Sequence, residues 1–222
     1  MHQAPYRSWT LLLLWLTGSG AQAAGGHFEV DDATMLGAGR CQLETWAFRG
    51  KALAEEGQHL GSACAFGGIE WGLNLDRLRT RGSEAADTWG PGLKWVFDAL
   101  PQRLSLGLAL GAARPLQGGG GTVATAYLPV TAWLDPTLQL HANLGADREP
   151  QLGSTRRLGL AAEWAPNEHW SFTLERRLQL RDWRSRAGVR YSFTPTMSVD
   201  LGVARAAGHA VLAAGFNWEW ER

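Results

Sequence analysis

The sequence lacks an excess of either charge. Its 21 lysine and arginine residues balance 21 aspartate and glutamate residues, and the formal net charge at pH 7 is zero. Proteins that bind nucleic acid usually carry a basic field, and this composition gives no sign of one. We therefore expect no nucleic-acid partner.

Long hydrophobic runs are also missing beyond the N-terminus: no later stretch reaches the roughly 18 consecutive apolar residues of a membrane helix. The N-terminus combines Arg7, an apolar run over residues 9–16 and the small-residue pattern Ala21-Gln22-Ala23. This combination is typical of a cleaved export signal, so we predict a signal peptide over residues 1–23.

The stretch after the signal, residues 24–39, is expected to be a periplasmic N-terminal segment. Its paired carboxylates, Asp31 and Asp32, precede the first strand and are predicted to lie in a solvated tail. Binding of Ca²⁺ by this pair is the alternative.

Cysteine is scarce, with only two residues in the chain. If the first hairpin is centred near residues 52–53, Cys41 and Cys64 fall opposite each other, within disulfide reach. Because the periplasm is oxidising, we predict a disulfide between them. The alternative is two unrelated buried thiols.

Alternation of apolar and polar residues is what the sequence has in abundance. In "IEWGLNLDRL", Trp71 and Leu73 share one face while Glu70 and Asn74 share the other, and the same period of two recurs through nearly the whole mature chain. This period predicts strands with one apolar face. Turn signals divide the chain into about twelve strands, near 40–49, 58–66, 69–78, 88–98, 104–112, 122–133, 138–146, 156–164, 169–179, 186–193, 197–205 and 209–220.

The connections between these strands alternate between short and longer ones, which is typical of a bacterial outer-membrane barrel with periplasmic turns and outer loops. We predict an all-β fold over residues 40–222: an antiparallel transmembrane β-barrel of about twelve strands, both termini periplasmic, in the bacterial outer membrane. Pro129 lies inside a predicted strand and would remove a ladder hydrogen bond, so a bulge or bend is expected there.

Tryptophan is frequent, and several of the twelve residues fall near the periplasmic ends of the predicted strands. Indole prefers the membrane–water interface, so residues at one height predict an aromatic girdle. The alternative is the core of a soluble β-sandwich. The predicted girdle residues are Trp71, Trp95, Trp164, Trp170, Trp218 and Trp220.

The final residues, "GFNWEW", resemble the C-terminal assembly signal of bacterial outer-membrane barrels, although the chain continues to Glu221 and Arg222. This resemblance implies the barrel-insertion machinery as a partner. The stretches "DDATMLGAGRCQLETW" and "LHANLG" are similar to small outer-membrane barrels of the transporter type, including those that resemble the MetA-pathway phenol-degradation type. That resemblance implies a barrel and a transport role, without a defined substrate.

The face opposite the apolar one would line the lumen, and it carries charges of both signs. Such a mixture suits either a weakly selective narrow channel or an interior closed by salt bridges, and both readings stay open. The predicted lumen residues are Glu70, Asp76, Lys94, His141, Asn143, Arg157, Glu163, Glu175, Arg177, Arg190 and Asp200.

Two charge clusters are predicted from register and position. Counting from the turns sets Glu175 opposite Arg190 and Arg190 opposite Asp200, a cross-strand charge chain in the lumen. Arginines gather at the outer strand ends and suit lipopolysaccharide phosphates, with solvated loop charges as the alternative. These arginines are Arg77, Arg79, Arg81, Arg176, Arg181, Arg184, Arg186 and Arg205.

No catalytic, metal or cofactor site is expected. A phospholipase-like site needs His and Ser two residues apart on a lipid-facing strand, whereas His141 precedes Asn143 at that spacing and both turn inward. His141 is therefore interpreted as a lumen residue bonded to neighbours such as Glu163. We expect a small passive channel for small solutes, in contact with outer-membrane lipids. The alternative is a closed structural or adhesive barrel, and the second alternative is a lipid-modifying enzyme of the outer membrane.

Overall fold

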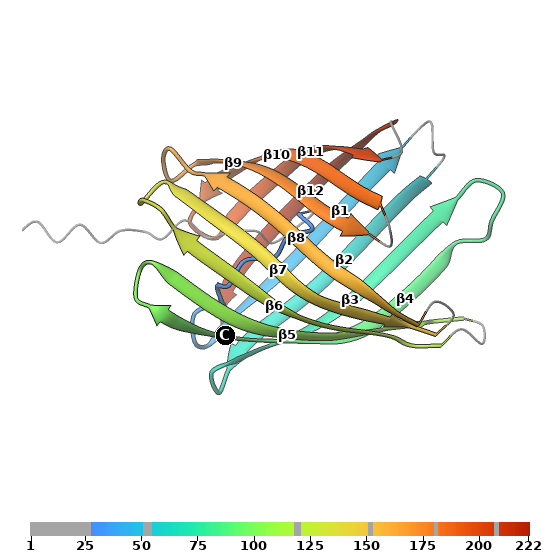
Figure 1. The fold of residues 1–222 in the computed structure, drawn as a ribbon, viewed down its shortest axis with the longest axis horizontal. Helices are drawn as coiled ribbons and strands as arrows, with labels where there is room; N and C mark the ends of the chain where they lie inside the picture. The colour runs from blue at the N-terminus through green and yellow to red at the C-terminus, as the bar shows by residue number, and fades with distance from the viewer. Residues whose placement is uncertain (1–27, 51–54, 118–120, 151–152, 180–181, 207–208) are drawn as a thin grey trace, which may run out of the picture.

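Twelve antiparallel strands form one sheet that closes on itself through pairing of the first strand with the last (Figure 1). The computed structural model describes residues 28–50, 55–117, 121–150, 153–179, 182–206 and 209–222, so the predicted signal peptide and Arg181 lie outside the described residues. The predicted all-β antiparallel barrel is confirmed. Its strands are β1 (Arg40–Gly50), β2 (Glu55–Phe66), β3 (Ile69–Thr80), β4 (Ala86–Leu100), β5 (Leu104–Pro115), β6 (Val123–Trp133), β7 (Leu138–Glu149), β8 (Gly153–Trp164), β9 (Trp170–Gln179), β10 (Asp182–Thr194), β11 (Met197–Ala206) and β12 (His209–Glu221).

Among the described residues, no helix has the length and apolar character needed to cross a bilayer.

The tight turns follow from local chemistry. Between β2 and β3, Gly67 and Gly68 adopt φ values of 63° and 75°, which a two-residue hairpin of this kind requires and which glycine adopts without steric cost. Between β6 and β7, the Asp135 carboxylate accepts hydrogen bonds from the backbone N–H groups of Thr137 at 2.7 Å and Leu138 at 3.0 Å. The Thr137 donors hold the pKa of the Asp135 carboxyl below its usual value.

The outward face of the barrel is an apolar belt. Leu160, Leu174 and Leu212 are 62%, 66% and 64% exposed, and each stands on the face opposite the lumen. A continuous exposed belt of this size is costly in water and is expected where strands contact lipid.

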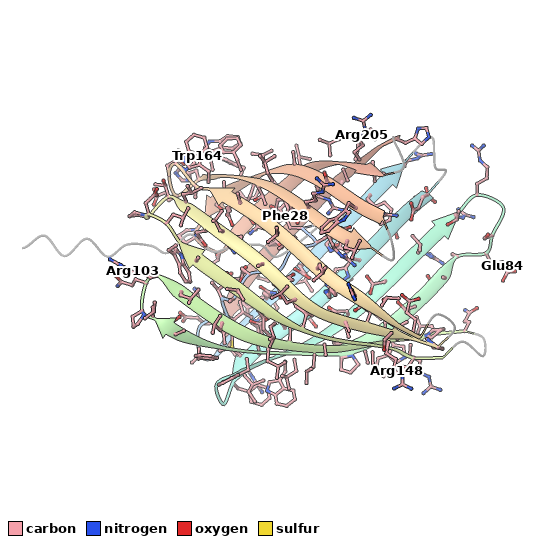
Figure 2. All side chains as sticks on the ribbon, in the orientation of Figure 1. Phe28, Glu84, Arg103, Arg148, Trp164 and Arg205 are labelled. Carbon is pink, nitrogen blue, oxygen red and sulfur yellow. A yellow bond between two sulfur atoms is a disulfide. The ribbon has the colours of Figure 1, made fainter. Side chains whose placement is uncertain are left out.

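The six predicted girdle tryptophans all lie at the barrel end where β1 begins and β12 finishes, the end at which Figure 2 labels Trp164. Most are exposed, and the rings of Trp218 and Trp220 are 5.0 Å apart. Two further outward tryptophans, Trp89 and Trp183, stand toward the opposite end and indicate a second aromatic band. Contact of these residues with a membrane interface stays a prediction.

Of the bulge or bend expected at Pro129, the bulge is wrong, although the paired residues of β5 and β6 are interrupted at Gly107 and Leu108, opposite Pro129 and Leu128. Strand β6 keeps one register with β5 on both sides of it, with Leu106 opposite Val130 and Ala109 opposite Tyr127. The proline ring is accommodated by Gly107, where a Cβ atom would come within 2.9 Å of it. A small opposing residue therefore lets the sheet carry the proline without changing register.

Cys41 and Cys64 are direct partners in the β1–β2 register and are joined by a disulfide on the outward face. A disulfide stabilises chiefly by restricting the unfolded chain, and here it closes a loop between strands that are already paired.

We expect the double variant Cys41→Ala/Cys64→Ala to lower the free energy of unfolding by about 2 kcal/mol, the lower end of the usual range. Urea unfolding, followed by the mobility difference between folded and unfolded barrel, measures this loss. Ser62→Ala on the same face of β2 is the control and should change little. Two reactive thiols in denatured, unreduced wild-type protein would contradict the disulfide.

Candidate functional site

The N-terminal segment Phe28–Leu36, called here the lumen segment, lies inside the barrel (Figure 1). Val30 is 1% and Asp32 is 2% exposed, and Phe28 stands about midway along the barrel in Figure 2. The solvated tail predicted for Asp31 and Asp32 is therefore wrong, because the barrel wall takes the place of water around these side chains. The 24–39 boundary itself stays a prediction.

Side chains of four wall strands hold the backbone of the lumen segment. Glu175 on β9 accepts hydrogen bonds from the N–H groups of Glu29 at 3.0 Å and Val30 at 2.9 Å. Asn143 on β7 binds Asp31 at two points, since its Oδ1 accepts from the Asp31 N–H at 2.8 Å and its Nδ2 donates to the Asp31 carbonyl at 2.6 Å.

Two further wall residues continue this pattern toward β1. Thr131 on β6 accepts from the Ala33 N–H at 2.7 Å, and Glu70 on β3 accepts from the Leu36 N–H at 3.0 Å. A buried backbone needs partners for its polar groups, and here side chains of the wall supply them.

Three cations of the wall, Lys94, Arg177 and Arg186, meet the carboxylates of the lumen segment and are called the lumen cation cluster. Lys94 Nζ lies 2.9 Å from Asp31 and 3.4 Å from Asp32. Arg186 lies 2.9 Å and Arg177 3.5 Å from the Glu29 carboxylate. The Tyr127 hydroxyl also donates to Asp31, at 2.9 Å.

Glycines in the wall leave room for the apolar side chains of the lumen segment. A Cβ atom at Gly188 would come within 2.5 Å of the Phe28 ring, and one at Gly159 within 2.9 Å of Val30. The Arg190 guanidinium stands over the Phe28 ring, 5.7 Å from its centre. The segment is thus fitted to this lumen by shape as well as by charge.

A cavity of about 800 Å³ lies beside the lumen segment and is bordered mainly by β1–β5. Inside it, His59 Nδ1 lies 2.7 Å from the Asp76 carboxylate and His59 Nε2 lies 3.1 Å from the Glu44 carboxylate. The Trp46 ring stacks on the His59 ring, with 4.8 Å between the ring centres. Carboxylates outnumber basic side chains in its lining: Glu29, Asp31, Asp32, Glu44, Glu55, Glu70, Asp76 and Glu219 against Lys94, Arg157, Arg177, Arg184 and Arg186.

The structure places every predicted lumen residue on the inward face. Asp76, Lys94, Arg157 and Arg177 border the cavity with Glu70, while Asn143 and Glu175 hold the lumen segment. The remaining residues form two buried groups, one of His141 and Glu163 and one of Arg190 and Asp200.

The predicted pairing of Glu175 with Arg190 is wrong. Strands β9 and β10 stay paired as far as Gln179 and Asp182, which sets Glu175 opposite Arg186, and the two side chains lie 3.4 Å apart. The ladder extends because Trp183 and Arg184 continue the alternation instead of starting a loop. Arg190 lies opposite Ser171 on one side and opposite Asp200 on the other, the latter as predicted.

The arginines predicted to form an outer rim divide between two environments. Arg184 and Arg186 face the lumen and border the cavity, so their assignment to the rim is wrong. Arg176 faces outward, with its guanidinium 5.3 Å from the Trp183 ring, and Arg205 is exposed (Figure 2). Arg184 and Arg186 lie within β10, which begins at Asp182, so the alternation of that strand turns both side chains inward.

A hydroxyl, an imidazole and a carboxylate form a chain of contacts next to the lumen segment. These three groups are the composition of a nucleophile–base–acid site. Thr131 Oγ1 is 2.9 Å from His141 Nδ1, and His141 Nε2 is 3.5 Å from Glu163. Thr131 is 0% exposed and its hydroxyl already accepts the Ala33 N–H. The group therefore supports the lumen segment in this conformation.

The described residues contain no group of three or more His, Cys, Asp or Glu side chains placed to hold a metal ion. Sequence reasoning missed the role of the lumen segment and the inward positions of Trp46, His59 and Tyr127. Trp46 was accessible from the alternation, since it follows Glu44 by two residues on the same face. The burial of the segment has no comparable local signal.

Comparisons with known proteins support the barrel fold. Residues 11–218 match the family described as "Uncharacterised conserved protein UCP029691". No curated protein matches the sequence.

Among solved structures, a KdgM porin in complex with disordered oligogalacturonate is similar, with a TM-score of 0.68, 8% identity and coverage of 80% of this chain and 98% of that one. The COG4313 outer membrane channel from Pseudomonas putida F1 has a TM-score of 0.66 and 11% identity, with coverage of 86% of this chain and 100% of that one. The outer membrane phospholipase A from Escherichia coli has a TM-score of 0.52 and 9% identity, with coverage of 81% of this chain and 91% of that one. At these identities the likeness establishes an outer-membrane barrel fold, and it includes both channels and an enzyme.

The buried pair Arg190 and Asp200 provides a test of the register. Arg190 Nε donates to Asp200 at 2.6 Å and its second guanidinium nitrogen donates at 3.0 Å, while Asn217 donates to the same carboxylate at 2.8 Å. Arg190→Ala leaves a buried carboxylate without its cation, so we expect a loss of about 3–5 kcal/mol in the free energy of unfolding. Adding Asp200→Ala should recover part of it.

Urea unfolding of the two single variants and the double variant measures the coupling, with Arg148→Ala at an exposed outward position as the control. A double variant whose loss equals the sum of the single losses would show that the two side chains do not interact.

Proposed function

We propose that this chain, which belongs to the family of Uncharacterised conserved protein UCP029691, is a passive channel for small polar solutes in the bacterial outer membrane. Support comes from a closed barrel with an apolar outer belt and a charged interior. Its similarity to a porin and to an outer membrane channel agrees with this role.

The observation that carries the proposal is the cavity of about 800 Å³ beside the lumen segment. Its lining extends from Glu55 and Arg184 near the ends of their strands down to Gln42 and Glu219 near the opposite end of the barrel. A solute that passes the barrel would use this space, since the lumen segment is held mainly by side chains of β6–β10 and reaches the other side of the lumen at Glu70 and Lys94.

The charge of this space favours small cations. Eight carboxylates and five lysine or arginine side chains border it, and rings or rows of acidic side chains favour cation passage. His59 lies between two of the carboxylates and offsets part of their charge. The proposed channel is therefore a narrow one with a preference for cations.

A closed structural barrel is the second candidate, and one specific observation favours it. The lumen segment is bound by salt bridges and by hydrogen bonds to its backbone, which is how a permanent filling of the interior would be held. In that case the cavity would be a pocket rather than a path.

Outer-membrane lipids and the barrel-insertion machinery are proposed as partners. The outward leucines fit lipid tails, and Phe216, Trp218 and Trp220 on the outward face of β12 carry the resemblance to an assembly signal. The outward arginines at the loop end, Arg79 and Arg205 among them, suit phosphate groups of lipopolysaccharide.

Planar bilayer recordings of the folded protein test the channel. We expect ion conductance with a reversal potential that favours K⁺ over Cl⁻ in a KCl gradient. Glu55→Gln removes a carboxylate from the cavity lining and should reduce this preference, whereas Glu84→Gln in the exposed loop (Figure 2) should leave it unchanged. Folded protein that gives no conductance would overturn the channel in favour of the closed barrel, and a preference for anions would overturn the charge argument.

A further inference from the structure

The lumen cation cluster is built as an anion site. Lys94 from β4 pairs with Asp31 and Asp32, whereas Arg177 from β9 and Arg186 from β10 pair with Glu29, so cations from separate parts of the wall face neighbouring carboxylates of the lumen segment. Their side chains are only 14%, 19% and 11% exposed. Three carboxylates of the lumen segment, those of Glu29, Asp31 and Asp32, thus supply the anions that these three cations contact.

Cations with so little access to water are costly unless an anion faces them. Arg186 also pairs with Glu175 of the wall, but Lys94 and Arg177 depend on the segment for their close ion pairs: 2.9 Å to Asp31 and 3.5 Å to Glu29. A lumen from which the segment withdrew would therefore leave Lys94 and Arg177 open to water and to any other anion present.

The same cations are accessible from the cavity. All three members of the cluster border it, together with the three segment carboxylates that they hold. Arg157 and Arg184 border it as well and extend the basic surface along β8 and β10. A solute in the cavity thus lies next to the cations and next to the anions that occupy them.

We propose that the lumen cation cluster is a binding site for solutes that carry two or more carboxylates, and that the acidic lumen segment occupies it as an internal competitor. This inference rests on the proposed channel function and adds to it an anion-binding site on the basic side of a cavity whose overall charge favours small cations. Exchange between segment and solute couples solute binding to opening of the segment side of the lumen. A solute with one carboxylate could replace only part of the charge that the segment supplies.

Internal competition predicts that loss of a wall cation and loss of a segment carboxylate change the affinity for an added solute in opposite directions. Removing a wall cation weakens the site for any anion. Weakening the segment's own carboxylates raises the fraction of molecules in which the site is free, and so strengthens the apparent binding of an added solute. A segment that is only a structural filling would give destabilised protein in both cases and improved binding in neither.

Binding of triglutamate to the folded full-length chain in detergent, measured calorimetrically, tests the proposal, with triglutamine and trilysine as probes of equal length. We expect triglutamate alone to bind. Lys94→Gln should weaken it about tenfold or more, as expected for loss of one charge-assisted contact. Glu29→Gln/Asp31→Asn should strengthen it. Arg148→Gln and Glu84→Gln at exposed positions are the matched controls.

Heat-dependent gel mobility establishes that each variant is folded, and Arg177→Gln replaces Lys94→Gln if that variant fails this check. Equal binding of triglutamine, weaker binding to the Glu29→Gln/Asp31→Asn variant, or no binding to that variant at all would overturn the proposal. Calorimetry measures binding independently of conductance. A barrel that binds triglutamate but passes no current would therefore overturn the channel and leave the anion site standing. A conducting barrel without this binding loses only the anion site.

Discussion

Closure of the sheet between β1 and β12 is the constraint on which the other features depend. Within hydrocarbon every backbone N–H and C=O must find a partner in the protein, and a closed sheet supplies them without an exposed edge. The pairing from Arg40 opposite Glu221 to Arg49 opposite Leu212 completes that ring. Once the sheet is closed, strand parity alone assigns each side chain to lipid or to lumen.

The interior created in this way is too polar to be left without compensation. Lys94, Arg177 and Arg186 would be unfavourable in a narrow lumen on their own, and the carboxylates of the lumen segment offset them. The backbone of the segment in turn needs Glu175, Asn143 and Thr131. The cavity that remains has unequal walls, acidic on the β1–β3 side and basic on the β8–β10 side, so a solute within it would meet charges of opposite sign across a short distance.

Much of the fold could be predicted because alternation is a local property. Trp71, Trp95 and Trp218 were placed on the outward face by parity alone, and Cys41 was set opposite Cys64 by counting from a hairpin centre. Counting failed where the hairpin centre was misjudged. The charged stretch around Asp182–Arg186 was taken for a loop but continues β10, which moves the partner of Glu175 from Arg190 to Arg186. The shift is an even number of residues, so Glu175 and Arg190 kept their predicted inward faces although the partner of Glu175 changed.

The sequence by itself therefore determined the barrel, the approximate number of its strands and which residues face inward, because those depend on period and turn chemistry within a few residues. Only the tertiary structure decided what fills the barrel. Nothing local to Phe28–Leu36 distinguishes a tail in water from a segment in a lumen, since its burial depends on Asn143, Glu175 and Lys94, which lie more than 60 residues away along the chain. The free energy of burying Asp31 and Asp32 depends on whether those wall residues converge, and convergence exists only once the sheet has closed.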